Sequence, residues 1–259
     1  MTRKTKRRQR PMAKVEHTEH PYPRPLSGAK IEHLPSALVP ARTALIGRYV
    51  TLEPLDAARH AGDLFEASHG SQAALHIWDF LPWGPWKSEE EFMNVLRQQT
   101  ARQDQVYYAI RPAAGGKACG QTSFLDIQPE QGVIEIGSIW FGMTLRRTRG
   151  ATESMYLMLR HAMDDLGYRR MQWRCNALNA ASRAAARRLG FRFEGIFYNH
   201  MIFKGRNRDT AWYSILDDEW PEIREIMEQW LAPSNFDQDG TAKTSLAALI
   251  AERGPSRRV

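Results

Sequence analysis

Cys119 and Cys175 are the only cysteines among 259 residues. Two thiols in a chain of this length exclude a disulfide framework and are typical of a reduced compartment, so we predict a cytoplasmic protein. No apolar run approaches the ~20 residues needed to span a bilayer, and the N-terminus has no apolar stretch like that of a signal peptide. We therefore predict no contact with a membrane. The eight histidines are scattered and no Cys/His spacing fits a ligand set, so we also predict no metal site.

Positive charge is unevenly distributed along the chain. The formal net charge is +7, and six basic residues lie within the first ten positions, so residues 11–259 carry a net +1. Such an arm suits binding of nucleic acid or of another anionic surface. It also suits a solvated extension without a partner, or a segment absent from a product that begins at Met12. We therefore expect any contact with nucleic acid to be made by this arm.

Composition divides the chain into three parts. Residues 1–42 are rich in proline, histidine and charge, which predicts a mostly irregular arm. Residues 43–232 have the periodic apolar pattern of a folded domain. Residues 233–259 are predicted to form a tail with one short helix near 245–253.

Strand and helix patterns alternate through the domain. Period-two apolar patterns predict strands at 45–54, 105–112, 117–128, 132–143, 168–175, 191–205 and 208–220. Helical spacing with capping residues predicts helices that begin after Asp56 and Ser88, and others at 149–166, 179–190 and 221–231. A right-handed crossover through helix 149–166 makes the strands on either side of it parallel neighbours, while the three strands before it are antiparallel. We therefore predict an α/β fold with a mixed, mostly antiparallel central sheet and helices on both faces.

A basic turn precedes the predicted helix at 149–166. The sequence LRRTRG (145–150) places three arginines at the helix end where the backbone dipole is already positive, which is normally unfavourable. Free N–H groups at a helix start and arginine side chains together bind phosphate oxygens well, so a bound anion would resolve the conflict. The alternative is a basic turn that contacts only water.

This turn, the following ATESMYLML (151–159) and the downstream NALNAASRAAARRLGFRFEG (176–195) resemble the GNAT superfamily of N-acetyltransferases. Within it, the chain is most similar to the branch that acetylates ribosomal-protein N-termini and related small amines. The resemblance covers about Leu45 to Trp220. It implies acetyl-CoA as the cofactor and a central sheet with one splayed pair of parallel strands.

The resemblance also implies that the turn binds the pyrophosphate of coenzyme A, in the family form Gln/Arg-x-x-Gly-x-Gly/Ala. One register places Arg146 first, Arg149 at the glycine and Ala151 last. A register shifted by one places Arg147 first and Gly150 at the glycine. Together the two registers predict these cofactor-binding residues: Arg146, Arg147, Thr148, Arg149, Gly150, Ala151 and Thr152.

The segment NAASRAAARRLGF (179–191) is the second motif of the resemblance. It implies that Asn179 and Ser182 lie near the pantetheine arm, although Asn179 would serve equally as a plain helix cap. Many members carry a tyrosine general acid seven residues after the asparagine, where this chain has Ala186. The proton for the leaving thiolate is therefore predicted to come from Tyr198 or from water.

The strand segment IEIGSIWF (134–141) is the one that, in this family, separates from the next parallel strand. The resemblance implies that N–H groups at Ile139, Trp140 and Phe141 bind pantetheine and polarise the acetyl carbonyl. Glu135 and Ser138 on the same strand are predicted to be catalytic, with Glu135 relaying a proton from the attacking amine. The alternative for Glu135 is a simple ion pair with a lysine or arginine on a neighbouring strand.

The aromatic, proline-broken segment HIWDFLPWGPW (76–86) is the predicted substrate pocket. Trp78 and Trp83 are predicted to stack on an acceptor whose amine is held by Asp79. The alternative is a loop that packs its rings over the sheet.

These features predict an N-acetyltransferase that moves an acetyl group from acetyl-CoA to a primary amine by direct attack in a ternary complex, because no Cys/His pair suited to an acyl-enzyme is evident. The acceptor would be a small-molecule amine or a protein N-terminus, and the protein a monomer or homodimer. Two alternatives remain open at this point. One is a non-catalytic acyl-CoA-binding sensor, and the other is a ribosome- or RNA-associated protein acetylase that uses its basic arm.

Overall fold

The computed structural model describes residues 38–253, so the prediction of an irregular basic arm falls almost entirely outside the described residues. Residues 38–42, which are described, contain no helix or strand. The predicted short helix near the C-terminus is present as α7 (Leu246–Ala251), after the 3-10 turn at Pro233–Asn235. All described residues belong to one unit, Leu34–Val259.

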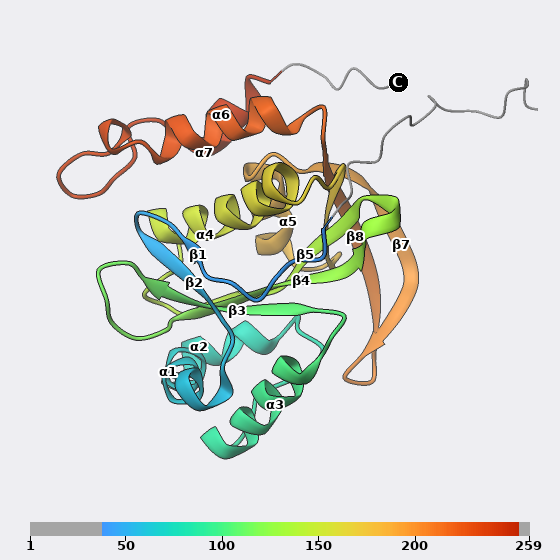
Figure 1. Cartoon of the computed structure of the whole chain (residues 1–259). Coiled ribbons are helices and arrows are strands. Elements are labelled where there is room, and N and C mark those ends of the chain that lie inside the picture. Colours follow the sequence, from blue (N-terminus) through green and yellow to red (C-terminus); the bar gives the residue numbers. More distant parts are fainter. Residues whose placement is uncertain (1–37, 254–259) are drawn as a thin grey trace, which may run out of the picture. The chain divides into compact units, whose positions relative to one another are not determined.

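The centre of the fold is a twisted eight-stranded sheet (Figure 1), with the strand order β1-β2-β3-β4-β5-β6-β8-β7. Every neighbouring pair is antiparallel except β5 and β6, which are parallel as the crossover through helix α4 (Arg149–Arg160) requires. The predicted fold class is confirmed. The strands are β1 (Leu45–Ile46), β2 (Val50–Pro54), β3 (Val106–Pro112), β4 (Gly120–Gln128), β5 (Val133–Phe141), β6 (Arg170–Asn176), β7 (Arg192–Phe203) and β8 (Arg206–Leu216).

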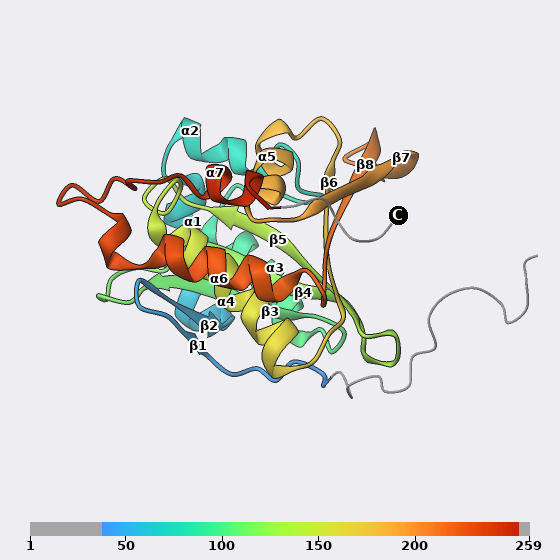
Figure 2. The same ribbon diagram turned by 90° about the horizontal axis from the view of Figure 1, so that it is seen from above.

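Helices cover both faces of this sheet (Figure 1). One face carries α1 (Ala57–His69), α2 (Gln72–Leu75) and α3 (Glu89–Ala101). The other carries α4 (Arg149–Arg160), α5 (Ala180–Arg188), α6 (Trp220–Leu231) and α7, with α6 lying across α4 (Figure 2). The predicted caps are present, since the side chains of Asp56 and Ser88 accept N–H groups from the first turns of α1 and α3.

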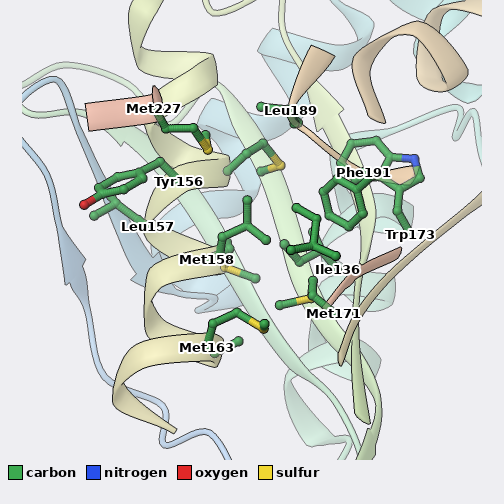
Figure 3. Close-up of a cluster of buried hydrophobic side chains, with 14 of the residues drawn as sticks. Ile136, Tyr156, Leu157, Met158, Met163, Met171, Trp173, Leu189, Phe191 and Met227 are labelled. Atoms are coloured by element: carbon green, nitrogen blue, oxygen red, sulfur yellow. The ribbon is translucent and has the colours of Figure 1, made fainter. Parts of the chain in front are cut away.

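Two apolar cores hold the layers together, one on each side of the sheet. In the larger core, Met158 and Met163 from α4 and the turn after it meet Ile136 of β5 and Met171 of β6 (Figure 3). The smaller core packs α1, α3 and the aromatic segment 77–78 against β3. Apolar burial on both faces explains why β5 reads as a nearly continuous apolar strand in the sequence. In β6 the buried Met171, Trp173 and Cys175 alternate with partly exposed polar residues.

The chain differs from the sequence-based expectation at residues 45–54, which form a hairpin of two strands instead of one strand. The turn between β1 and β2 is stabilised from a distance by the buried carboxylate of Glu153 on α4. That carboxylate accepts the N–H groups of Arg48, Tyr49 and Val50 at 2.6–2.9 Å. A contact across about a hundred residues leaves no local signal, so the alternating pattern alone could not reveal the turn.

The parallel strands β5 and β6 separate shortly after they begin, as predicted. They pair only from Val133 to Glu135, opposite Arg170 to Gln172. Beyond this point β5 is bulged against β4, with Ser138 and Ile139 opposite one residue of β4, and Ser138 has a φ of 52°. Gly137 leaves room there for the Leu125 side chain, since a Cβ atom would lie 2.2 Å from Leu125 Cδ1 and that side chain would have to move. The result is a fork in the sheet.

Candidate active site

The fork between β5 and β6 opens into a cavity of about 630 Å³. Its floor is the diverging part of the two strands, from Glu135 to Ile139 and from Trp173 to Asn176. Its other walls come from the segment 77–86, from α3 and the start of β3, from the first turn of α5, and from the β7–β8 hairpin. Elements from the whole length of the domain therefore meet at one place.

Glu135 lies at the point of the fork and is only 3% exposed. Its carboxylate forms an ion pair with Arg174 on β6, and the same guanidinium pairs with Asp126 on β4. Burial outweighs the attraction of Arg174 and raises the pKa of Glu135 to about 7. The predicted ion-pair alternative is thus present, but the group also lines the cavity and can take up a proton near neutral pH.

Ser138 also lines the cavity, beside a tyrosine that the sequence analysis did not single out. The hydroxyl of Tyr107 on β3 donates to Gln105 Oε1 and interacts with the Ser138 side chain. Burial raises the pKa of Tyr107, so its hydroxyl keeps its proton. These contacts join the bulge of β5 to the wall formed by β3.

The basic turn before α4 offers unpaired N–H groups. Thr148 is the helix cap, since its Oγ1 accepts the N–H of Ala151 at 3.2 Å. Within residues 38–253, no backbone or side-chain acceptor is found for the N–H groups of Arg147, Arg149 and Gly150. The side chain of Arg146 is exposed and donates to the Phe141 carbonyl at 3.0 Å. An anion at this turn would meet several free donors.

Arg149 has a different environment from Arg146 and Arg147. Its guanidinium donates to the Tyr49 hydroxyl at 2.7 Å and lies over the rings of both Tyr49 and Phe236. Aromatic faces stabilise this cation without an anion, so one of the three arginine charges is explained by packing.

The remaining residues of the turn contribute their backbone. Gly150 approaches the β1–β2 hairpin, where a Cβ atom would lie 2.8 Å from Val50 Cγ1. Ala151 is buried, and the Thr152 hydroxyl accepts from Arg188 Nη2 on α5 at 2.9 Å.

Asn179 and Ser182 both line the cavity, at the start of α5. The Asn179 side chain accepts the N–H of Ser182 at 3.0 Å and caps the helix. The Ser182 hydroxyl accepts the indole N–H of Trp173 at 3.0 Å. Asn179 therefore caps α5 and also lines the cavity, so its role as a helix cap is compatible with a position near the pantetheine arm.

The residues predicted to bind substrate separate into two groups. Trp83 lines the cavity. Trp78 is 1% exposed and packs in the smaller core against Trp86 and Trp140. Asp79 is exposed, pairs with His76 at 3.0 Å and is not among the residues that line the cavity.

Other predicted residues also lie at different depths. Ile139 lines the cavity, whereas the Trp140 side chain is buried in the smaller core and the Phe141 side chain packs on the larger core. Tyr198 lies on the edge strand β7, is 75% exposed, and is not among the residues that line the cavity.

Arg174 and Arg208 are further polar residues of the cavity wall that the sequence analysis missed. Arg174 left a signal, because a charged residue alternates with the buried Trp173 and Cys175 on β6. The sequence holds no such signal for Arg208, because it follows the turn between β7 and β8 and charged residues are common in exposed hairpins.

No group of three or more potential metal ligands occurs in the described part of the chain. No described helix is long and apolar enough to cross a bilayer.

Comparison with known proteins identifies relatives of this architecture. The family described as the acetyltransferase (GNAT) domain matches residues 50–192. The structure of a GCN5-related N-acetyltransferase from Brucella melitensis shares 44% identity and a TM-score of 0.79, over 82% of this chain and 96% of that one. A structure from Chromobacterium violaceum, described as a probable acetyltransferase of the GNAT family, shares 41% identity and a TM-score of 0.70, over 75% of this chain and 96% of that one.

A curated relative from Bacillus subtilis is named "Putative ribosomal N-acetyltransferase YdaF". It is 25% identical over 183 residues, which are 69% of this chain and 97% of the relative.

Proposed function

The chain belongs to the GNAT acetyltransferase family and is an N-acetyltransferase, and from this premise we propose that it transfers an acetyl group from acetyl-CoA to a primary amine by direct attack in a ternary complex. The observation that carries the proposal is the fork between β5 and β6, with a buried carboxylate of raised pKa at its apex. Acetyl-CoA would supply the acetyl group as a thioester. The protein would supply the groups that bind the cofactor, accept the proton of the amine and polarise the acetyl carbonyl.

Two sets of free N–H groups suit the cofactor. The turn before α4 would hold the diphosphate, through the N–H groups of Arg147, Arg149 and Gly150 and the side chains of Arg146 and Arg147. The diverging part of β5 would hold the pantetheine arm, because beyond Glu135 it no longer pairs with β6. Asn179 and Ser182 line the opposite wall and can bond to the amides of that arm.

Glu135 is the proposed general base. A carboxylate with a pKa of about 7 can accept a proton from an ammonium group as it becomes the attacking amine and can pass it to solvent. Arg174 keeps the carboxylate oriented and partly ionised in spite of its burial. Ser138 lies on the same bulged segment, where N–H groups from Ile139 onward would polarise the acetyl carbonyl.

Direct attack is favoured by the chemistry of the cavity. Burial raises the pKa of Cys175, so this thiol of the cavity wall stays protonated and is a poor nucleophile. None of the described residues that line the cavity is a histidine that could activate it. Both cysteines are free and buried, which supports a reduced, cytoplasmic setting.

The leaving thiolate needs a proton, and Ala186 cannot supply one. Tyr198 is exposed on β7 away from the residues of the cavity wall. We therefore assign this proton to solvent.

An acetylation screen with mass detection tests the proposal. Small primary amines, aminoacyl conjugates and peptides with free N-termini are incubated with the full chain and acetyl-CoA. Steady formation of an acetylated amine with release of coenzyme A is the expected result. Tight binding of coenzyme A without turnover of any amine would instead identify a sensor.

A further inference from the structure

Arg208 on β8 is a cation of the cavity wall. Its guanidinium lies 4.3 Å from the centre of the Phe203 ring, and Nη1 donates to the sulfur of Met201 at 3.4 Å. Its Nε is buried and has no hydrogen-bond partner. No carboxylate within residues 38–253 forms an ion pair with Arg208.

The other two arginines of the cavity wall are paired. Arg174 has both Glu135 and Asp126, and Arg102 has Asp104. Burial lowers the pKa of Arg208, and this effect outweighs the attraction of Glu135, which is itself ion-paired with Arg174. Arg208 is half-buried, and a sulfur atom and an aromatic face compensate poorly for the part of the guanidinium's hydration that is lost. An anionic oxygen group would suit this guanidinium.

Neither end of the proposed cofactor site supplies that anion. The diphosphate is assigned to the turn before α4, and the pantetheine arm in the fork is uncharged. The remaining occupant of the cavity is the acceptor, whose amine has to reach Glu135. Glu135 and Arg208 line the same cavity, so an amine at Glu135 and an anionic group at Arg208 can belong to one small molecule.

We propose that Arg208 binds a carboxylate on the acceptor, and that the acceptor is a primary amine whose own skeleton carries that carboxylate. This inference rests on the proposed function and specifies its substrate class. A free amino acid and a peptide with an acidic side chain beside its N-terminus share this chemistry. Guanidinium and carboxylate form two parallel hydrogen bonds, which orient the amine as well as hold it.

The chemical step balances without any further reactant. The amine nitrogen forms a bond to the acetyl carbonyl carbon, and the carbon–sulfur bond breaks. The proton leaving nitrogen goes to Glu135 and then to solvent, and the sulfur takes a proton from solvent to leave as a thiol. The carboxylate on Arg208 is unchanged throughout.

The test compares matched acceptors on the full chain. An amino acid, its α-amide, the amine without the carboxylate, and a dipeptide with an acidic second residue are each assayed for kcat/KM. A charge-assisted hydrogen bond predicts a preference of at least about 10-fold for a carboxylate-bearing acceptor over its neutral match. Whether the amino acid or the dipeptide is preferred distinguishes the two sources.

Arg208→Gln should abolish that preference, because the KM of the carboxylate-bearing acceptor should rise to that of the neutral amide. Any effect on kcat through Glu135, on which Arg208 acts electrostatically, should be the same for both acceptors. Arg208→Lys should retain part of it. Arg206→Gln is the matched control, because Arg206 is an exposed residue of the same strand outside the cavity wall, and it should behave as the wild type.

The outcomes separate the two proposals. Equal kcat/KM for carboxylate-bearing and neutral acceptors in the wild type overturns the role of Arg208, whether or not the variants fold. A loss in Arg208→Gln that is equal for all acceptors, or that falls on the KM of acetyl-CoA, also overturns it. Absence of turnover with every amine contradicts the proposed function itself.

Discussion

Glu135 combines a structural ion pair with a position at the fork of the sheet where it can act on a proton. Its carboxylate closes an ion pair that ties β5 to β6 and β4 through Arg174 and Asp126. It also stands at the fork with a pKa raised to about 7. A group held this way is ionised in a large fraction of molecules at neutral pH, which suits a general base.

Replacing Glu135 by glutamine should lower kcat by about 100-fold or more while leaving the KM for acetyl-CoA unchanged, because a positioned base contributes about this much. The wild-type rate should rise with pH through about 7, where Glu135 loses its proton, and this limb should be absent in the variant. Steady-state kinetics from pH 5.5 to 9 measures both.

Glu130→Gln is the matched control, since Glu130 is an exposed carboxylate in the turn before β5. A fully active Glu135→Gln enzyme with an unchanged pH profile would remove Glu135 from the mechanism.

The three arginines of the turn before α4 lie in different environments. Arg146 and Arg147 are exposed beside free N–H groups, whereas Arg149 is fixed between Tyr49 and Phe236. The first pair is available to an anion, and the third supports the packing of the hairpin and the C-terminal segment.

The double variant Arg146→Ala with Arg147→Ala should raise the KM for acetyl-CoA by about 10-fold or more with little change in stability, because charged hydrogen bonds of about 1.5–3 kcal/mol are lost. Arg149→Ala provides the comparison. It should lower the free energy of unfolding by about 1–2 kcal/mol through lost cation–π and hydrogen-bond contacts, and affect the KM less. The KM for acetyl-CoA and urea unfolding measure the two effects. A KM raised more by Arg149→Ala than by the double variant would contradict the assignment of Arg146 and Arg147 to the anion.

The aromatic segment 76–86 is tied to α1 by a neutral histidine. His69 Nε2 accepts the N–H of Trp86 at 3.1 Å, and the ring stacks on Phe65. Burial lowers the pKa of His69 below its usual 6.5, so the folded state prefers the neutral ring.

The unfolded chain therefore binds more protons at His69 than the folded chain does just below pH 6.5. The contribution of neutral His69 to the free energy of unfolding is therefore fully present above pH 6.5. It is lost as the pH falls below 6.5 and protonation favours the unfolded chain. We expect the free energy of unfolding to decline from pH 7 to pH 5, and the decline to be shallower in His69→Gln. Urea unfolding at several pH values measures this, with His76→Gln, an exposed histidine, as control. Parallel pH curves for the wild type and His69→Gln would show that His69 is not responsible.

At the scale of the whole molecule, local patterns predicted the architecture well. The caps Asp56 and Ser88, the crossover through α4 and the strand periodicities are properties of short segments. All are found in the structure except the single strand expected at 45–54. Gly137 within a strand pattern was a sound indicator of the bulge, because its reason is a close approach by one neighbouring strand.

Features made by distant segments were out of reach of such patterns. The β1–β2 turn depends on Glu153, the environment of Arg149 depends on Phe236, and the cavity wall takes Tyr107 and Arg208 from opposite sides of the fork. The aromatic segment was predicted as one pocket, but its residues face different ways, with Trp83 on the cavity and Trp78 in the core. Composition identified the segment, and only the packing assigns each ring.

A crystal structure with coenzyme A tests the central claim most directly. The account predicts the diphosphate on the N–H groups between Arg147 and Gly150, the pantetheine arm between β5 and β6, and the sulfur within the cavity near Glu135. Coenzyme A bound elsewhere, or β5 and β6 paired along their full length with the arm excluded, would contradict it.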